Sequence, residues 1–171
     1  MTTPNNSLNP FTLAAGEGRT PEPLDILGEA VLVKLTNDDI NGAAAIFHLT
    51  VPPMSGPPVH RHSREDEWFY VLGGEITAKI NDRQIVLDAG GSAFAPRGIV
   101  HTYQNFGDAV AQMLVMVTPG GFNRFFEDLS SLNQGLPAPD LPRTEQLMSN
   151  YGIELLGPPL SEGESRGCAS A

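Results

Sequence analysis

The segment Pro57–Glu75, PPVHRHSREDEWFYVLGGE, joins two closely spaced histidines, a short polar stretch and an apolar aromatic run. Residues i and i+2 of a strand point to the same face, so the side chains of His60 and His62 lie on one side if VHRH is a strand. Two imidazoles on one face can bind a common divalent metal ion. The spacing therefore predicts that His60 and His62 are metal ligands.

The polar sequence SRED, residues 63–66, separates these histidines from Glu67. On an unbroken strand Glu67, an odd number of positions after His62, would face away from it. We therefore expect a turn or bulge at residues 63–66. Glu65 and Asp66 are alternatives to Glu67 as ligands, but a turn exposed to solvent accounts for both of them.

The run EWFYVL, residues 67–72, has the alternation of a strand with one face in the core. Glu67, Phe69 and Val71 share that face. A carboxylate at the head of an apolar column needs a partner, because burying an unpaired charge is costly. A bound metal ion would be such a partner, so Glu67 is the third candidate ligand.

A second segment, GGSAFAPRGIVHTYQN at residues 90–105, has a similar design. His101 follows the turn at residues 96–98 and begins an expected strand in an apolar setting. Of the four histidines in the chain, three thus fall in two turn-and-strand units. His48, in AIFHLT, has no comparable neighbours, and we expect it to be structural or to support the site indirectly.

Short apolar stretches separated by turn residues continue through residues 29–118. Turn signals spaced by roughly 8–12 residues are typical of a β-sandwich or barrel. The 18 glycines and 15 prolines among the 171 residues favour a strand-rich fold over a helical bundle. The pattern predicts an all-β domain over residues 29–118.

Residues 119–160 have a different pattern and are expected to be a helical extension. A first amphipathic helix is expected near residues 119–133 and a second, short helix near residues 143–151. The apolar stripe of the first helix is expected to pack on the outside of the sheet or on a partner subunit, rather than to contact a ligand. Its members are Phe122, Phe125, Phe126 and Leu129.

The two ends of the chain lack strand or helix periodicity. Residues 1–28 are rich in Pro, Asn, Gly and Thr and are expected to form an irregular arm. Residues 161–171 are expected to be a disordered tail. This tail holds the single cysteine, Cys168, so an intrachain disulfide is excluded and a cysteine-based metal site is not expected.

Charge and hydropathy limit the partners. The formal net charge is −10, and a strongly acidic surface repels phosphate backbones and anionic lipids, so neither nucleic acid nor a membrane is an expected partner. No apolar run approaches the ~20 residues that cross a bilayer, and the first residues, MTTPNNSLNPF, do not have the pattern of a signal peptide. A cytoplasmic location is expected.

The two histidine segments together resemble the paired motifs of the cupin superfamily. The first motif reads Gly, five residues, His-x-His, three or four residues, Glu, six residues, Gly, and its core matches His60, His62, Glu67 and Gly74. The sequence departs from the motif at its leading glycine, because Gly56 lies closer to His60 than the motif's five intervening residues allow. The second motif reads Gly, five residues, Pro-x-Gly, two residues, His, three residues, Asn. It is matched throughout by Gly90, Pro96, Gly98, His101 and Asn105.

The resemblance covers roughly residues 30–118 and implies an antiparallel jelly-roll β-barrel, whereas the arm and the expected C-terminal helices lie outside it. It also implies one divalent metal ion inside the barrel, held by His60, His62, Glu67 and His101. Three nitrogens and one oxygen suit Fe, Mn, Ni, Co, Zn or Cu, with no choice among these metals. A homodimer is expected, because barrels of this kind commonly pair through sheet edges, and the arm at residues 1–28 is expected to cross to the partner.

Among cupins, HRHSREDEWFYVLGGEI and the phenylalanine-rich helix most resemble single-domain members of the quercetin 2,3-dioxygenase type. This implies a metal-dependent dioxygenase for a flavonol-like or other small enolic or aromatic substrate, with Glu67 as the catalytic base that accepts a substrate proton. Alternatives are another metal-assisted cupin enzyme (an isomerase, decarboxylase or oxygenase) and a non-catalytic cupin that binds a small molecule. Candidate walls of the substrate pocket, which a plain core would also contain, are Phe69, Val71, Ile76, Ile99 and Tyr103.

Overall fold

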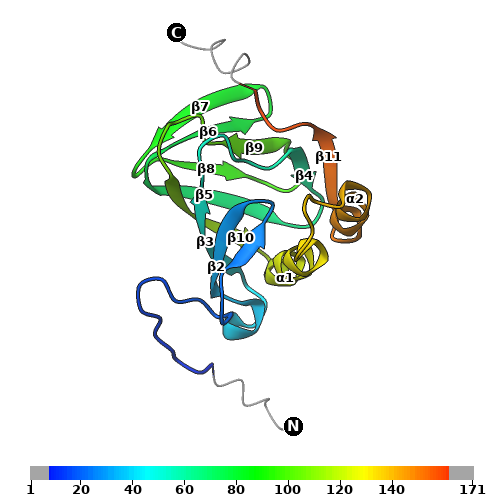
Figure 1. Cartoon of the computed structure of the whole chain (residues 1–171). Coiled ribbons are helices and arrows are strands. Elements are labelled where there is room, and N and C mark those ends of the chain that lie inside the picture. Colours follow the sequence, from blue (N-terminus) through cyan, green and yellow to red (C-terminus); the bar gives the residue numbers. More distant parts are fainter. Residues whose placement is uncertain (1–7, 162–171) are drawn as a thin grey trace.

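The computed structural model describes residues 8–161. Two β-sheets face each other, and two helices lie at one side of them (Figure 1). The elements in chain order are β1 (Leu24–Ile26), β2 (Glu29–Leu35), the short 3-10 helix η1 (Asn37–Ile40), β3 (Ala45–Val51), β4 (Val59–His62), β5 (Asp66–Gly73), β6 (Glu75–Ile80), β7 (Arg83–Asp88), β8 (Ser92–Ala95), β9 (His101–Gln104), β10 (Ala111–Thr118), α1 (Phe122–Asn133), α2 (Leu141–Asn150) and β11 (Ile153–Gly157).

The strand orders are β1-β2-β3-β10-β5-β8 in the six-stranded sheet and β11-β4-β9-β6-β7 in the five-stranded sheet. All paired strands are antiparallel. The all-β, antiparallel jelly roll with short C-terminal helices is therefore confirmed. β4 and β5 are consecutive in the chain but lie in different sheets, so the segment between them crosses from one sheet to the other.

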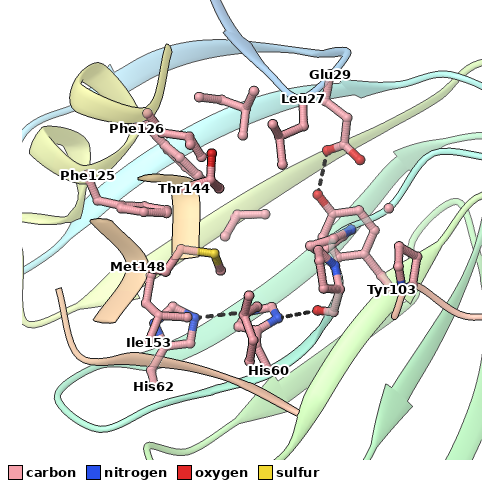
Figure 2. Close-up of a pocket in the computed structure, with 18 of the residues that line it drawn as sticks. Leu27, Glu29, His60, His62, Tyr103, Phe125, Phe126, Thr144, Met148 and Ile153 are labelled. Atoms are coloured by element: carbon pink, nitrogen blue, oxygen red, sulfur yellow. Dashed lines mark hydrogen bonds between the residues drawn. The ribbon is translucent and has the colours of Figure 1, made fainter. Parts of the chain in front are cut away.

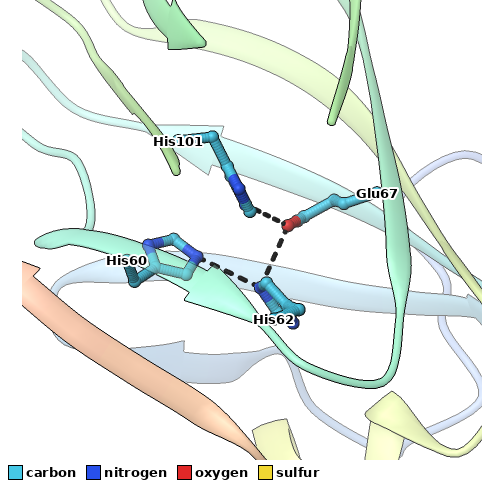
Figure 3. A group of neighbouring side chains, drawn as sticks. All are labelled: His60, His62, Glu67 and His101. Atoms are coloured by element: carbon cyan, nitrogen blue, oxygen red, sulfur yellow. Dashed lines mark hydrogen bonds and ion pairs between the residues drawn. The ribbon is translucent and has the colours of Figure 1, made fainter. Parts of the chain in front are cut away.

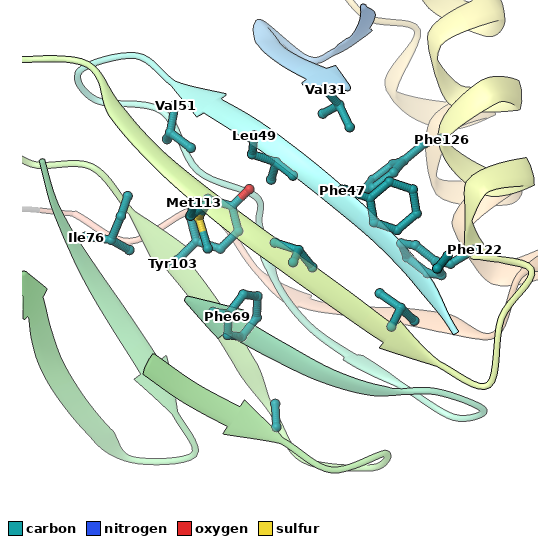
Figure 4. Close-up of a cluster of buried hydrophobic side chains, with 14 of the residues drawn as sticks. Val31, Phe47, Leu49, Val51, Phe69, Ile76, Tyr103, Met113, Phe122 and Phe126 are labelled. Atoms are coloured by element: carbon teal, nitrogen blue, oxygen red, sulfur yellow. The ribbon is translucent and has the colours of Figure 1, made fainter. Parts of the chain in front are cut away.

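The core fills the space between the sheets (Figure 4). In β3, Ala45, Phe47, Leu49 and Val51 are buried, whereas the residues between them are partly exposed. The same period of two runs through β5, where Glu67, Phe69 and Val71 face inward as predicted. Alternating burial of this kind fixes the register of each strand, because a shift by one residue would expose its apolar face.

The predicted C-terminal helices are present as α1 and α2. The apolar stripe of α1 is buried, and the ring of Phe126 meets Phe47 of β3 edge-to-face at a centroid distance of 4.7 Å. α2 begins at the N-cap Asp140, whose side chain accepts a hydrogen bond from the backbone N–H of Arg143. Figure 1 shows both helices beside one side of the paired sheets, with α2 next to β11 and α1 next to α2.

Two strands lie outside the expected domain limits of 29–118. β1 belongs to the predicted arm and pairs with β2, and β11 belongs to the predicted helical extension and pairs with β4. Both are short, three and five residues, and owe their conformation to a neighbouring strand rather than to a period in their own sequence. This explains why periodicity did not reveal them.

The described part of the arm, residues 8–28, contacts its own chain. Arg19 donates its backbone N–H to Val33 and forms an ion pair with Asp39, and its guanidinium lies over the ring of Phe11. The homodimer, and the crossing of the arm to a partner, stay predictions. Residues 1–7 and 162–171, with Cys168 and all but the first residue of the expected disordered tail, lie outside the described residues. None of the helices within residues 8–161 has the length and apolar character needed to span a membrane.

Candidate metal centre

Four side chains from distant parts of the sequence meet between the sheets (Figure 3). They are His60, His62, Glu67 and His101, all buried, and each offers one donor atom within 4.8 Å of the others. The group consists of three imidazole nitrogens and one carboxylate oxygen. This donor set suits first-row divalent metals rather than magnesium or calcium, which prefer oxygen ligands.

Both sheets contribute to the group. His60 in β4 is the register partner of His101 in β9, so these two imidazoles come from adjacent strands of the five-stranded sheet. Glu67 comes from β5 of the six-stranded sheet and faces them across the interior. The predicted break before Glu67 is present at residues 63–65, with Asp66 already the first residue of β5. Because the chain crosses from one sheet to the other between His62 and Glu67, both side chains face the interior despite their odd spacing in the sequence.

Backbone carbonyls orient two of the three imidazoles. Nδ1 of His60 lies 2.7 Å from the carbonyl oxygen of Pro58, and Nδ1 of His101 lies 2.9 Å from that of Ile99. A carbonyl oxygen can only accept, so each Nδ1 carries the proton and each Nε2 has a free lone pair. Both lone pairs are directed at the centre of the group, as in a metal ligand whose outer nitrogen is held by a backbone acceptor.

The spacing of the inner atoms fits a bound cation. Oε2 of Glu67 lies 2.9 Å from Nε2 of His101 and 3.2 Å from Nε2 of His62, and the Nε2 atoms of His60 and His62 are 3.1 Å apart. Two bonds of about 2.1 Å at right angles span roughly 3.0 Å, which is the range of these separations. Lone pairs this close repel one another unless a proton or a metal ion lies between them. The residues therefore fit a divalent transition metal, and the geometry does not distinguish among such metals.

Without a metal, a proton on His62 reduces the repulsion among the inner atoms of the group. Burial lowers the pKa of His62, but the carboxylates of Glu65 and Glu67 outweigh burial and raise the pKa to about 9. Burial and the neighbouring imidazoles of His101 and His62 lower the pKa of His60 to about 3. Burial raises the pKa of Glu67, but its interactions with the imidazoles of His101 and His62 lower the pKa further than burial raises it. Metal binding near neutral pH therefore has to displace a proton from His62.

Glu65 has a different place from the one expected. Its Oε2 lies 3.5 Å from Nδ1 of His62, and within the described residues neither of these two buried atoms has a hydrogen-bond partner. The carboxylate thus faces the outer nitrogen of His62, where a backbone carbonyl faces those of His60 and His101. Asp66, in contrast, is on the surface as expected and pairs with Arg97, whose hydrogen bonds lower the pKa of Asp66 to about 2.

Replacing Glu65 with alanine is expected to weaken metal binding about tenfold, because partners that orient a metal ligand typically contribute 10- to 100-fold in affinity. Glu65→Gln keeps an acceptor but removes the charge, so its affinity should lie between those of the wild type and the alanine variant. Asp66→Asn is the matched control in the same segment and should bind metal as the wild type does. Titration of the metal-free proteins with cobalt(II) measures all three, and equal affinities throughout would show that Glu65 does not support His62.

A cavity of about 500 Å³ adjoins the metal group on the side of His60, His62 and Glu67 (Figure 2). Its volume is in the range of small-molecule sites. Of the five candidate wall residues, Phe69 and Tyr103 line it. Val71 and Ile76 are buried in the core and do not line it, and the backbone carbonyl of Ile99 orients His101.

Several cavity residues could not be assigned from the sequence. The phenylalanines of α1 were expected to serve packing alone, but Phe122, Phe125 and Phe126 pack on the sheet and also line the cavity. The ring of Phe122 lies 5.0 Å from that of His62. The available signal was the excess of aromatic residues on one face of α1, and its meaning depends on where α1 docks. His48, on the partly exposed face of β3, is not among the grouped residues, as expected.

Comparison with known proteins agrees with the fold. Residues 47–117 match the family described as "Cupin domain". The oxalate-binding protein of Thermotoga maritima is 27% identical over 104 residues, which are 57% of this chain and 86% of that protein. The quercetin 2,3-dioxygenase of Bacillus subtilis is 26% identical over 144 residues, which are 82% of this chain but only 42% of that protein. Among solved structures, an RmlC-like cupin from Shewanella frigidimarina has a TM-score of 0.53 at 21% identity, covering 60% of this chain and 87% of its own.

The last of these likenesses shows the fold alone, whereas the family match spans both histidine segments. That match, the antiparallel jelly roll and the buried group of three histidines and one glutamate agree. Residues 47–117 of this chain are therefore a cupin domain.

Proposed function

We propose that this protein is a metal-dependent dioxygenase that acts on a flavonol-like or other small enolic or aromatic substrate. The observation that supports it most is the union of the metal group with an apolar, aromatic-walled cavity. His60, His62 and Glu67 line one side of that cavity, and three phenylalanines of α1 line another. A planar aromatic molecule can therefore lie against apolar rings while one of its oxygen atoms reaches the imidazoles.

The chemistry is divided between the metal and the chain. A divalent metal held by His60, His62, Glu67 and His101 would supply a Lewis acid that stabilises a deprotonated substrate oxygen. Glu67 is the one carboxylate in the group, so it accepts the proton that the substrate hydroxyl gives up. The aromatic residues beside the imidazoles, Phe122 and Phe69, exclude water and hold the rings in position.

The cavity suits an aromatic substrate better than a small dianion such as the oxalate of the Thermotoga maritima relative's name. Among the described residues that line the cavity, none is lysine or arginine. A dianion would leave most of this space empty and would find no cationic side chain beside the metal. The distant likeness to a quercetin 2,3-dioxygenase supports the same choice.

Oxygen consumption tests this proposal. The metal-free protein is loaded separately with Fe, Mn, Co, Ni, Cu and Zn, and oxygen uptake and loss of flavonol absorbance are followed with 3-hydroxyflavone and quercetin. We expect turnover with at least one redox-active metal and none with His62→Ala.

Binding of the flavonol without turnover by any of these metals would contradict catalysis and would favour a non-catalytic binding cupin. Absence of both binding and turnover would contradict the aromatic substrate class. In that case the substrate would have to be sought for another metal-assisted reaction, such as isomerisation or decarboxylation.

A further inference from the structure

A second carboxylate lines the cavity, and the metal site does not use it. Glu29 is at the start of β2, followed on the same inward face by Val31 and Val33, and its relative exposure is 5%. It thus repeats the arrangement of Glu67 in β5, a carboxylate at the head of an apolar inward column. Glu29 lines the cavity, and Figure 2 shows it on the opposite side of the drawn pocket from His62.

Two hydroxyl groups hold this carboxylate in place. The hydroxyl of Tyr103 donates to Oε2 of Glu29 at 2.6 Å, and the hydroxyl of Ser55 donates to Oε1 at 2.9 Å (Figure 2 shows the first). Tyr103 belongs to β9, two residues after the ligand His101. The side chain of Glu29 is therefore fixed by the strand that also carries part of the metal group.

A purely structural role does not account for a carboxylate here. Within the described residues no lysine, arginine or histidine pairs with Glu29, and burial raises its pKa more than the bonds from Tyr103 and Ser55 lower it. A neutral acceptor would bridge the same two hydroxyls without the cost of burying a charge. A carboxylate can accept about four hydrogen bonds, and Glu29 accepts one at each oxygen, so acceptor sites are left for a ligand in the cavity.

We propose that Glu29, held by Tyr103 and Ser55, is a specificity-determining residue that accepts a hydrogen bond from a hydroxyl group on the end of the ligand remote from the metal. This inference rests on the proposed function, because it assumes that an aromatic ligand occupies the cavity. It adds a requirement that the metal site alone does not make: the preferred ligand carries hydrogen-bonding groups at both ends, an oxygen for the metal and a hydroxyl for Glu29. The apolar walls between the two ends contribute affinity but little selection among aromatic ligands.

Matched ligands test the proposal by calorimetry on the full-length, metal-loaded protein. The probes are 3-hydroxyflavone, which has no remote hydroxyl, and its 7-hydroxy and 4′-hydroxy derivatives. Hydrogen bonds to a charged group contribute enough to change affinity about tenfold to a hundredfold. The wild type should therefore bind one of the two derivatives at least about tenfold more tightly than 3-hydroxyflavone. Glu29→Gln should lose most of that preference, while binding 3-hydroxyflavone as the wild type does.

Thr144→Val is the matched control, because Thr144 is a buried polar residue of the same cavity whose hydroxyl accepts a hydrogen bond from Asn133. It should keep the preference. Equal affinity of the wild type for all three flavones, or a preference that survives Glu29→Gln, would overturn this inference while leaving the proposed function intact. Binding of none of them would overturn the proposed substrate class and this inference with it. The comparison of ligands on the wild type needs no variant, so a folding defect in Glu29→Gln would not obscure the result.

Discussion

His62→Ala is expected to abolish tight metal binding, with an affinity at least about 100-fold below that of the wild type. The variant removes one of the four grouped donors and leaves His60, His101 and Glu67. It also removes the imidazole between Glu67 and Glu65, so two carboxylates lose a cationic partner at once. The effect should exceed the 10- to 100-fold loss typical of a residue that only supports a ligand. Titration with cobalt(II) should give one metal ion per chain for the wild type and no tight site for the variant.

His48→Ala is the control for this experiment. His48 lies on the partly exposed face of β3 and is not among the grouped residues, so this variant should retain one metal ion per chain. Far-ultraviolet circular dichroism of both variants checks folding, which matters because His62 also contacts Phe122. Wild-type affinity in folded His62→Ala would show that the tight site lies elsewhere.

Phe47→Ala is expected to lower the free energy of unfolding by about 3–5 kcal/mol, the usual cost of removing a buried phenylalanine. Phe47 has a relative exposure of 0%, and its ring packs edge-to-face on Phe126 at 4.7 Å and on Phe122 at 6.3 Å. Its loss therefore leaves a void between β3 and α1. Single domains are stable by about 5–15 kcal/mol, so the variant loses a large part of the total. Urea denaturation of the metal-free protein measures the change.

Phe94→Ala is the matched substitution at the surface. Phe94 is on the edge strand β8 with a relative exposure of 54%, and a change there should alter stability by about 0.5 kcal/mol or less. Similar losses for the two variants would contradict the docking of α1 on β3. Phe122 and Phe126 of α1 belong both to the wall of the cavity and to the hydrophobic core.

The sequence predicted the elements whose signal is local. Alternation in β5 placed Glu67, Phe69 and Val71 on one inward face, and helical spacing located α1. These features depend on neighbours in the chain, which a sequence shows directly. The grouping of His60, His62, Glu67 and His101 joins two distant segments, and it was predicted from the resemblance of two short motifs to those of the cupin superfamily.

At the position of the first motif's leading glycine, this chain has a backbone conformation that favours glycine but a different residue. The motif has five residues between its leading glycine and the first histidine. Counted back from His60, that glycine position is 54, which is methionine in this chain. Met54 has φ 60°, in the left-handed region that favours glycine. Gly56 has a different constraint, since a Cβ there would collide with the carbonyl oxygen of Tyr103. A left-handed backbone is therefore present at the position of the motif's glycine, although the residue there is methionine.

The cavity could not be predicted, because its walls come together only through long-range packing. Glu29, Tyr103 and Phe126 belong to β2, β9 and α1, and no short pattern links them. β11 was missed for the same reason, because its conformation depends on pairing with β4. Glu65 looked like a residue of a solvated turn until the fold placed its carboxylate beside His62.

X-ray absorption spectroscopy at the metal edge tests the central claim most directly. The protein, loaded with one equivalent of cobalt(II), should show three imidazole ligands and oxygen donors at about 2.1 Å, with the imidazole signal lost in His62→Ala. A spectrum with oxygen donors alone, or one with the same imidazole count in His62→Ala, would contradict a metal centre built from His60, His62, Glu67 and His101.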